Sequence, residues 1–76
     1  MFPRITIDPA ILRGRPCIRG MRISVSLVVN LVANGMSNEE ILREYPDLMI
    51  EDIQESLLFA SALAQDEFHP FLSPAA

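Results

Sequence analysis

The chain is short, acidic and half hydrophobic. It has 76 residues, six of them Arg and none Lys, with ten acidic residues and a formal net charge of −4. This length allows one domain at most, and a lone domain of roughly this size buries only about 60% of its unfolded surface. Because half of the residues are hydrophobic, we expect a second subunit to cover the surplus apolar surface.

Some classes of protein are excluded by what the sequence lacks. The single cysteine, Cys17, rules out an internal disulfide and a Cys-based metal site, and we expect it to be a small apolar side chain in a turn or strand. No stretch approaches the ~20 apolar residues of a membrane span, and no basic leader precedes an apolar run. We therefore expect a cytoplasmic protein with no membrane segment, no cofactor and no metal.

Charge is distributed unevenly along the chain. Residues 1–22 carry five Arg and one Asp, whereas residues 23–76 carry one Arg and nine acids. A protein that is acidic overall can still bind phosphate through one local basic patch. The N-terminal segment is therefore the candidate phosphate-binding surface.

The first 24 residues predict short β structure interrupted by turns. Residues 4–7, Arg-Ile-Thr-Ile, are β-branched and alternating, and Asp8-Pro9 closes them as a strand. Residues 10–14 predict a turn or a single helical turn. Residues 18–23 alternate apolar and cationic residues around a glycine, which favours either a pair of strands or one bent strand. So few strands need helices, or a partner's strands, to pack against.

Clear boundary signals predict the first two helices. Ser24-Val25-Ser26 opens an apolar helix, and Asn34-Gly35 ends it because glycine suits the left-handed position after a helix. Ser37 and Glu40 form a predicted capping box for a short second helix. Pro46 stops that helix, since the residue before proline avoids the helical region.

The third predicted helix runs from about Ile50 to Gln65 or Asp66 and is apolar on two sides. Its predicted core stripe comprises Ile53, Leu57, Ala60 and Ala64. Its predicted exposed face comprises Glu51, Asp52, Gln54, Glu55 and Ser56. A second apolar face in the distal half comprises Leu58, Phe59, Ala62 and Leu63. Because one small domain does not need both apolar faces, the second is the predicted dimer interface.

The chain therefore divides into three parts. Residues 1–24 form an Arg-rich segment of strands and turns, residues 25–66 form three helices, and residues 67–76 form a flexible tail broken by prolines. Three compact helices, the second short and capped, match a homeodomain-like helix-turn-helix core, although the same periodicity fits other three-helix bundles. The expected fold class is mainly α with short N-terminal β-strands.

A series of spaced motifs resembles a known family. The motifs are Ile7-Asp8-Pro9, Gly14-Arg15-Pro16-Cys17-Ile18-Arg19-Gly20-Met21-Arg22-Ile23, Gly35-Met36-Ser37-Asn38-Glu39-Glu40-Ile41-Leu42, Tyr45-Pro46-Asp47-Leu48 and Glu51-Asp52-Ile53. In order and spacing they resemble the domain of unknown function 433 family of small bacterial and archaeal proteins, over residues 5 to about 64. Two positions depart from the family pattern. Met21 stands where Thr is frequent, and Met49 stands where Thr or Ser usually caps the third helix, a cap that contributes about 1 kcal/mol.

The resemblance implies binding rather than catalysis. Members of the family are described as having a homeodomain-like helical core with an N-terminal β element, and they are usually dimeric. Many look like antitoxins encoded beside a small nuclease-like toxin with a PIN-type fold. The resemblance therefore implies a homodimer whose partner is a PIN-like toxin.

The arginines of the N-terminal segment are the predicted DNA or phosphate-binding residues. They are Arg13, Arg15, Arg19 and Arg22. A β element with alternating Arg can enter a DNA groove. The alternative is that these arginines pair with acidic helices of the same chain or of a second one.

An acidic surface covers the second and third predicted helices. Its members are Glu39, Glu40, Glu44, Asp47, Glu51, Asp52 and Glu55. It is either a solvated face with acids near helix N-termini or a mimic of RNA phosphate that covers a basic nuclease surface. The third helix occupies the position of a recognition helix, but its exposed face has no cation, so we do not expect it to enter a DNA groove.

The tail supplies the predicted partner-binding residues, Phe68, Phe71 and Leu72. His69 has no motif-linked catalytic partner, so the sequence predicts no enzyme. We expect a small dimeric antitoxin-type protein that neutralises a PIN-like nuclease and binds operator DNA for autoregulation. The alternative is a protein-only interaction module without DNA binding.

Overall fold

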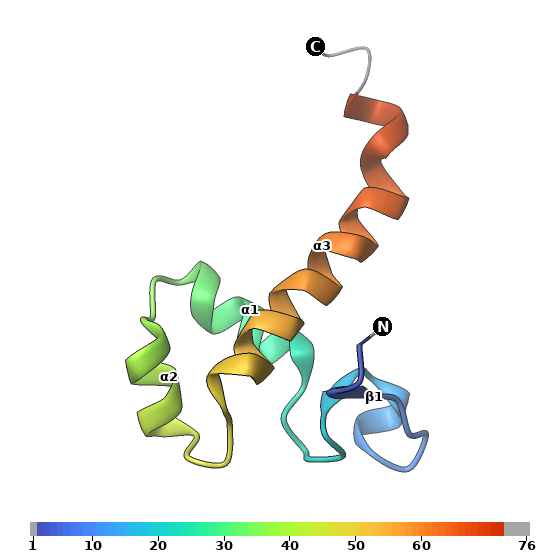
Figure 1. Ribbon diagram of the computed structural model, residues 1–76. Helices are drawn as coiled ribbons and strands as arrows, with labels where there is room; N and C mark the ends of the chain where they lie inside the picture. Colours follow the sequence, from blue (N-terminus) through green and yellow to red (C-terminus); the bar gives the residue numbers. More distant parts are fainter. Residues whose placement is uncertain (1, 73–76) are drawn as a thin grey trace.

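The structure, a computed structural model, describes the backbone of residues 2–72 and the side chains of residues 2–65. Figure 1 shows that helices dominate this part of the chain. The elements are β1 (Ile5–Thr6), a 3-10 turn at Leu12–Gly14, β2 (Cys17–Ile18), α1 (Val25–Ala33), α2 (Asn38–Glu44) and α3 (Ile50–Leu72). The prediction of a mainly helical chain with short N-terminal strands is confirmed. None of the helices within residues 2–72 is long and apolar enough to cross a membrane.

The N-terminal sheet is a two-stranded antiparallel ribbon followed by a tight reversal. The register pairs Ile5 with Ile18 and Thr6 with Cys17. Arg19 and Gly20 then have φ of 45° and 75°, and the Met21 N–H donates to the Ile18 carbonyl over 2.7 Å. Two successive left-handed residues closed by this bond form a type I′ turn. Because an isolated bridge then joins β2 to Ser24, residues 18–23 reverse between paired segments and do not form one bent strand.

Local capping sets the boundaries of α1 and α2, as the sequence predicts. At the start of α1 the Ser24 hydroxyl accepts the Leu27 N–H at 3.0 Å. Gly35 follows the helix with φ of 90°, the left-handed conformation that closes a helix. Before α2, the Ser37 hydroxyl accepts the Glu40 N–H and the Glu40 carboxylate accepts the Ser37 N–H. The predicted capping box is therefore confirmed.

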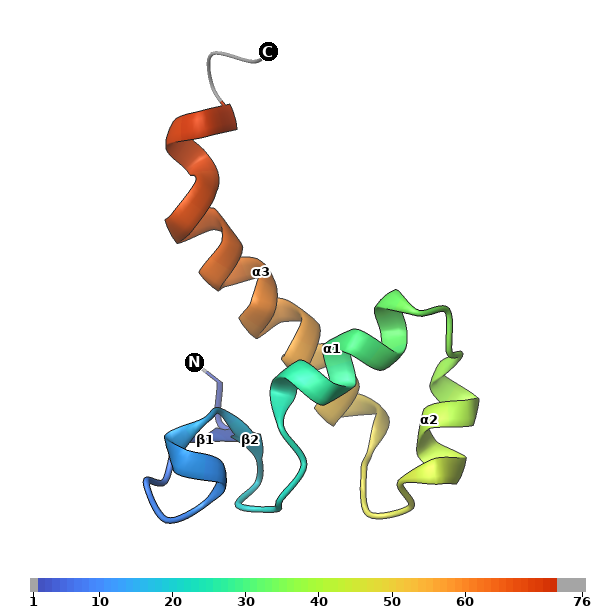
Figure 2. The same ribbon diagram turned by 180° about the vertical axis from the view of Figure 1, so that it is seen from behind.

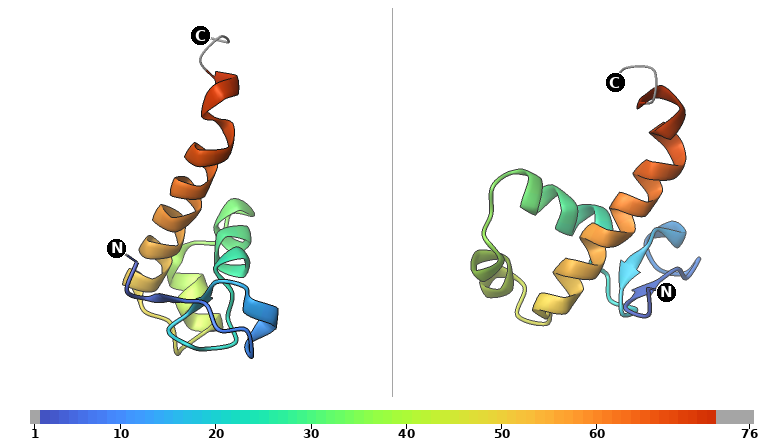
Figure 3. Two further views of the ribbon diagram at one scale, coloured as in Figure 1. Left: turned by 90° about the vertical axis from the view of Figure 1, so that its right-hand side faces the viewer. Right: turned by 45° about the horizontal axis from the view of Figure 1, so that its top comes forward.

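The core lies where α1, α2 and the N-terminal sheet meet the first half of α3. Figures 2 and 3 show α1 crossing α3, with α2 on one side of the crossing and the sheet on the other. The buried hydrophobic side chains are Cys17, Ile18, Val25, Val28, Ile41, Leu48 and Ile53. The core therefore draws on β2, on all three helices and on the loop between α2 and α3.

The buried face of α3 differs from the predicted core stripe. Ile53 is buried as predicted, but Leu57 is 38% exposed and Ala64 is exposed. Asp52 and Ser56, which the sequence predicted to be exposed, are fully buried. The Ser56 hydroxyl donates to the Asp52 carbonyl at 2.8 Å, and two arginines neutralise the Asp52 carboxylate. Because its polar groups are satisfied, this face of α3 can turn inward despite its polarity.

The end of α3 also differs from the prediction. The helix continues to Leu72, through residues 67–72 that were predicted to belong to a flexible tail. No glycine interrupts the sequence between Ala64 and Pro70. A proline inside a helix removes one backbone hydrogen bond and bends or breaks the helix, and Pro70 stands in the last turn of α3. Figures 1 and 3 show the second half of α3 extending away from the other elements. The predicted partner-binding side chains of Phe68, Phe71 and Leu72 lie outside the described residues.

Candidate functional site

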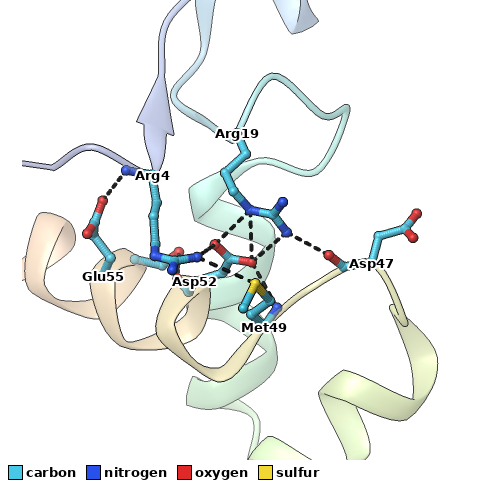
Figure 4. A network of polar contacts seen from close by, with 7 residues as sticks. Arg4, Arg19, Asp47, Met49, Asp52 and Glu55 are labelled. Carbon is cyan, nitrogen blue, oxygen red and sulfur yellow. Dashed lines mark hydrogen bonds and ion pairs between the residues drawn. The ribbon is translucent and has the colours of Figure 1, made fainter.

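A buried carboxylate joins three segments of the chain at the start of α3 (Figure 4). The Asp52 side chain has no exposed surface and accepts 3.0 Å hydrogen bonds from Arg4 Nη1 and Arg19 Nη2. Arg19 Nε approaches the same carboxylate at 3.1 Å. The Met49 N–H donates to Asp52 Oδ2 at 2.8 Å. We call these four residues the Asp52 cluster, and it fastens β1, the type I′ turn and the loop before α3 to one another.

The conformation of the turn explains how Arg19 reaches α3. Its φ of 45° is a left-handed value that Asn, Asp and Gly adopt more readily than Arg. The cost is offset by the contacts that the side chain gains, since Arg19 Nη2 also donates to the Asp47 carbonyl at 2.7 Å. A long, planar guanidinium can bridge a carboxylate and a carbonyl at once, which the shorter residues favoured in this turn cannot do.

The electrostatics of the Asp52 cluster favour the charged pair. The pKa of Asp52 is raised by burial, but hydrogen bonds from Arg19, the Met49 N–H and Arg4 together outweigh burial and hold it below the usual value of 3.8. The pKa of Arg19 is raised, chiefly by its hydrogen bond to Asp52. Among the described side chains, no buried nitrogen or oxygen atom lacks a hydrogen-bond partner. The cluster is therefore a satisfied ion pair that holds its charge at neutral pH.

Two further contacts hold the N-terminal segment against α3. The Arg4 N–H donates to the Glu55 carboxylate. The rings of Phe2 and Phe59 meet edge to face, with centroids 5.2 Å apart and planes at 86°. Such aromatic pairs contribute about 0.5–1.5 kcal/mol beyond the area that they bury. These contacts and the Asp52 cluster together fix how the Arg-rich segment is presented.

The structure separates the four predicted phosphate-binding arginines. Arg19 is paired with Asp52, which is the internal ion pair weighed as the alternative for this segment. Arg13, Arg15 and Arg22 are exposed, and within residues 2–65 their side chains make no ion pair or hydrogen bond. Arg13 and Arg15 line a small cleft of about 180 Å³ beside the left-handed 3-10 turn. Three of the four arginines therefore remain available to a partner.

The predicted dimer face of α3 is partly open to solvent. Leu58 is 63% exposed and Leu63 is 49% exposed, whereas Phe59 and Ala62 are half-buried. Beside this face lies a groove of about 370 Å³ between α1, α3 and the N-terminal segment. The groove is lined by Arg15, Pro16, Ser24, Val25, Ser26, Val29, Phe59, Ala60 and Leu63. We call it the α1–α3 groove, and it extends the apolar surface beyond the four predicted residues.

Sequence reasoning missed Arg4 and Asp52 as partners, and it missed the groove. One local signal was present, because Asp52 stands three residues after Met49, the spacing at which an acid accepts the N–H that precedes a helix. Met49 lacks a capping side chain, yet this return bond from Asp52 is formed. The pairing with Arg4 and Arg19 spans 48 and 33 residues, and no local pattern indicates it.

The part of the chain that the structure describes contains no assembled metal site. There, no set of three His, Cys, Asp or Glu side chains is placed to hold a metal ion. Cys17 is buried, and its thiol donates to the Arg15 carbonyl at 3.2 Å. The side chain of His69 lies outside the described residues.

Comparisons with known proteins identify a family and a similar protein. Residues 5–60 match the family described as "Protein of unknown function (DUF433)". The chain is similar to an uncharacterized protein, y4eO, of Sinorhizobium fredii, with 40% identity over 58 residues. That alignment covers 76% of this chain but only 26% of the relative, so the chain spans about a quarter of its length. No solved structure matches the chain. The family match covers most of the chain, including Arg19, Met49 and Asp52 of the Asp52 cluster, and the protein belongs to the DUF433 family.

Proposed function

We propose that this protein is a non-catalytic, antitoxin-type binding protein of the cytoplasm. It acts as a homodimer that binds and neutralises a PIN-like nuclease, and it binds operator DNA to repress its own operon. Its three helices would serve as a homeodomain-like helix-turn-helix core. The observation that carries the proposal is the apolar surface of α3, where Leu58 and Leu63 are 63% and 49% exposed.

Exposed leucines on one helix favour a protein partner. Burying a Leu side chain contributes about 1.5–3 kcal/mol, so two such residues at the centre of an interface can support a complex. The second half of α3 extends away from the other elements (Figure 1), where a partner would have access to it. The sequence continues with Phe68, Phe71 and Leu72, which are the proposed anchors for the nuclease.

Operator binding is supported by the exposed arginines of the N-terminal segment. Arg13, Arg15 and Arg22 carry charge without an acidic partner among the described residues. The first turn of α3 instead presents Glu51, which would repel phosphate. In this proposal the N-terminal segment, not α3, therefore meets the DNA backbone. A protein-only module is the second candidate, favoured by the pairing of Arg19 with Asp52, which leaves three arginines in place of the predicted four.

Nuclease binding is tested with the protein encoded by the neighbouring reading frame. The two proteins should co-purify, and the complex should cleave RNA more slowly than the free nuclease. Deleting residues 67–76 should release the nuclease while the remaining chain stays folded, since the core side chains end before residue 60. Leu58→Glu places a charge on the exposed apolar surface of α3 and should weaken the complex with the nuclease. Gln54→Glu, at an exposed position of the same helix, is its control. Full nuclease activity in the presence of excess protein would refute the proposal.

DNA binding is tested by its dependence on salt. Replacing Arg13 and Arg22 with Ala should weaken binding to all sequences and lower the slope of log affinity against log salt by roughly 1 per lost phosphate contact. Arg43→Ala removes an exposed arginine from α2 and serves as the matched control. If neither the protein nor its nuclease complex binds the upstream promoter in low salt, the protein-only module is correct.

A further inference from the structure

We infer that the α1–α3 groove receives the distal segment of α3, residues 61–67, from a second copy of this chain. The two copies would exchange these segments about a twofold axis, so that each copy fills the groove of the other. This inference rests on the homodimer of the proposed function and specifies its interface. It also assigns Arg15 to the subunit contact and not to DNA.

The groove has the composition of a subunit interface. Its floor and walls are formed by Pro16, Val25, Val29, Phe59, Ala60 and Leu63, and its volume is about 370 Å³. Arg15 and two serines supply the polar part of the lining, and none of the described lining residues is a carboxylate. An apolar centre with a single cation at its edge fits an apolar helix that also carries negative charge.

The distal segment of α3 has the complementary properties. It begins beside the groove, where Leu63 is 49% exposed, and it then leaves the rest of its own chain (Figures 1 and 3). A continuous helix cannot turn back into a groove that lies along its own side, so the segment reaches such a groove only on another molecule. In a dimer with one twofold axis, the projecting helix of each copy can lie in the open groove of the other copy.

Charge complementarity selects a second copy over an unrelated apolar peptide. The sequence continues from Leu63 to Asp66 and Glu67 about one helical turn later. A second copy therefore brings two negative charges together with its apolar residues. Arg15 is exposed at the groove and pairs with no acid among residues 2–65. In a twofold dimer this attraction occurs twice, once in each groove.

The test measures the dimer dissociation constant by sedimentation equilibrium of the full chain. Ala60→Phe fills the groove from within and should weaken the dimer by at least about tenfold. Gln54→Phe adds the same side chain at an exposed position of α3 that neither lines the groove nor belongs to the distal segment, and it should leave the constant within about twofold. Circular dichroism and thermal unfolding of both variants confirm that each is folded.

A charge exchange tests the proposed pairing separately, and it decides the question if Ala60→Phe does not fold. Arg15→Glu should weaken the dimer severalfold, and adding Asp66→Arg and Glu67→Arg to it should restore the wild-type constant. A monomeric wild-type protein would overturn the inference. So would a dimer that resists both Ala60→Phe and Arg15→Glu but dissociates on Leu58→Glu, because its interface would then lie outside the groove. Nuclease inhibition, measured on the same variants, shows independently whether the proposed function holds.

Discussion

Replacing the buried carboxylate of the Asp52 cluster by an amide should destabilise the whole domain. Asp52→Asn preserves the shape of the side chain and one oxygen that can accept the Met49 N–H, which is 2.8 Å away in the wild type. It removes the negative charge that Arg4 and Arg19 share at 3.0 Å. The amide nitrogen must then face a guanidinium group, which has no acceptor to offer it.

The expected magnitude follows from the hydrogen bonds that lose their charge. A hydrogen bond to a charged group contributes about 1.5–3 kcal/mol, compared with about 1 kcal/mol for a neutral one. Because two arginines are affected, the expected loss in the free energy of unfolding is about 2 kcal/mol. The loss is no larger because both guanidinium groups are partly exposed to solvent. A domain of this size has a free energy of unfolding of roughly 4–11 kcal/mol. The variant would therefore lose a substantial share of its stability.

Urea unfolding followed by circular dichroism measures this loss. Asp47→Asn is the matched control, because Asp47 is exposed, its hydrogen bond to the cluster comes from its backbone carbonyl, and its carboxylate is the smallest of the causes that raise the pKa of Arg19, so its variant should stay within about 0.5 kcal/mol of the wild type. Combining Asp52→Asn with Arg19→Asn should cost less than the sum of the two single changes, since both remove the same contact. Equal stability losses in Asp52→Asn and Asp47→Asn would refute the reasoning.

Three further predictions concern pH and helix boundaries. The pKa of Asp52 is lower in the folded chain than its ordinary 3.8, so its stabilising effect is present above that value and is lost as the pH falls through the lower folded pKa. Acid titration of unfolding should show this loss in the wild type and not in Asp52→Asn. Ser37→Ala should lower the free energy of unfolding by about 1 kcal/mol in urea titrations, because the Glu40 N–H loses its side-chain acceptor. Gly35→Ala should lower the melting temperature through a backbone cost of about 1–2 kcal/mol, because φ is 90° there, and an unchanged midpoint would contradict the left-handed assignment.

Several elements were predictable because their signals are local. The hydroxyl oxygens of Ser24 and Ser37 each accept a hydrogen bond from the backbone N–H of the residue three positions later in the sequence. Gly35 ends α1 through its own backbone conformation. Short strands followed from β-branched alternation in residues 4–7. In each case the sequence near the boundary contains all the groups that determine it, so reading the chain in order is sufficient.

The sequence by itself therefore determined where α1 and α2 begin and end, and only the tertiary structure decided which face of α3 is buried. A lone carboxylate is better solvated in water than in a core, so the local pattern placed Asp52 outside with its acidic neighbours. Arg4 and Arg19 reverse that preference from 48 and 33 residues away. The same long-range pairing removes Arg19 from the predicted arginine patch. Local pattern cannot reveal these outcomes, because they depend on which distant charges the fold brings to one carboxylate.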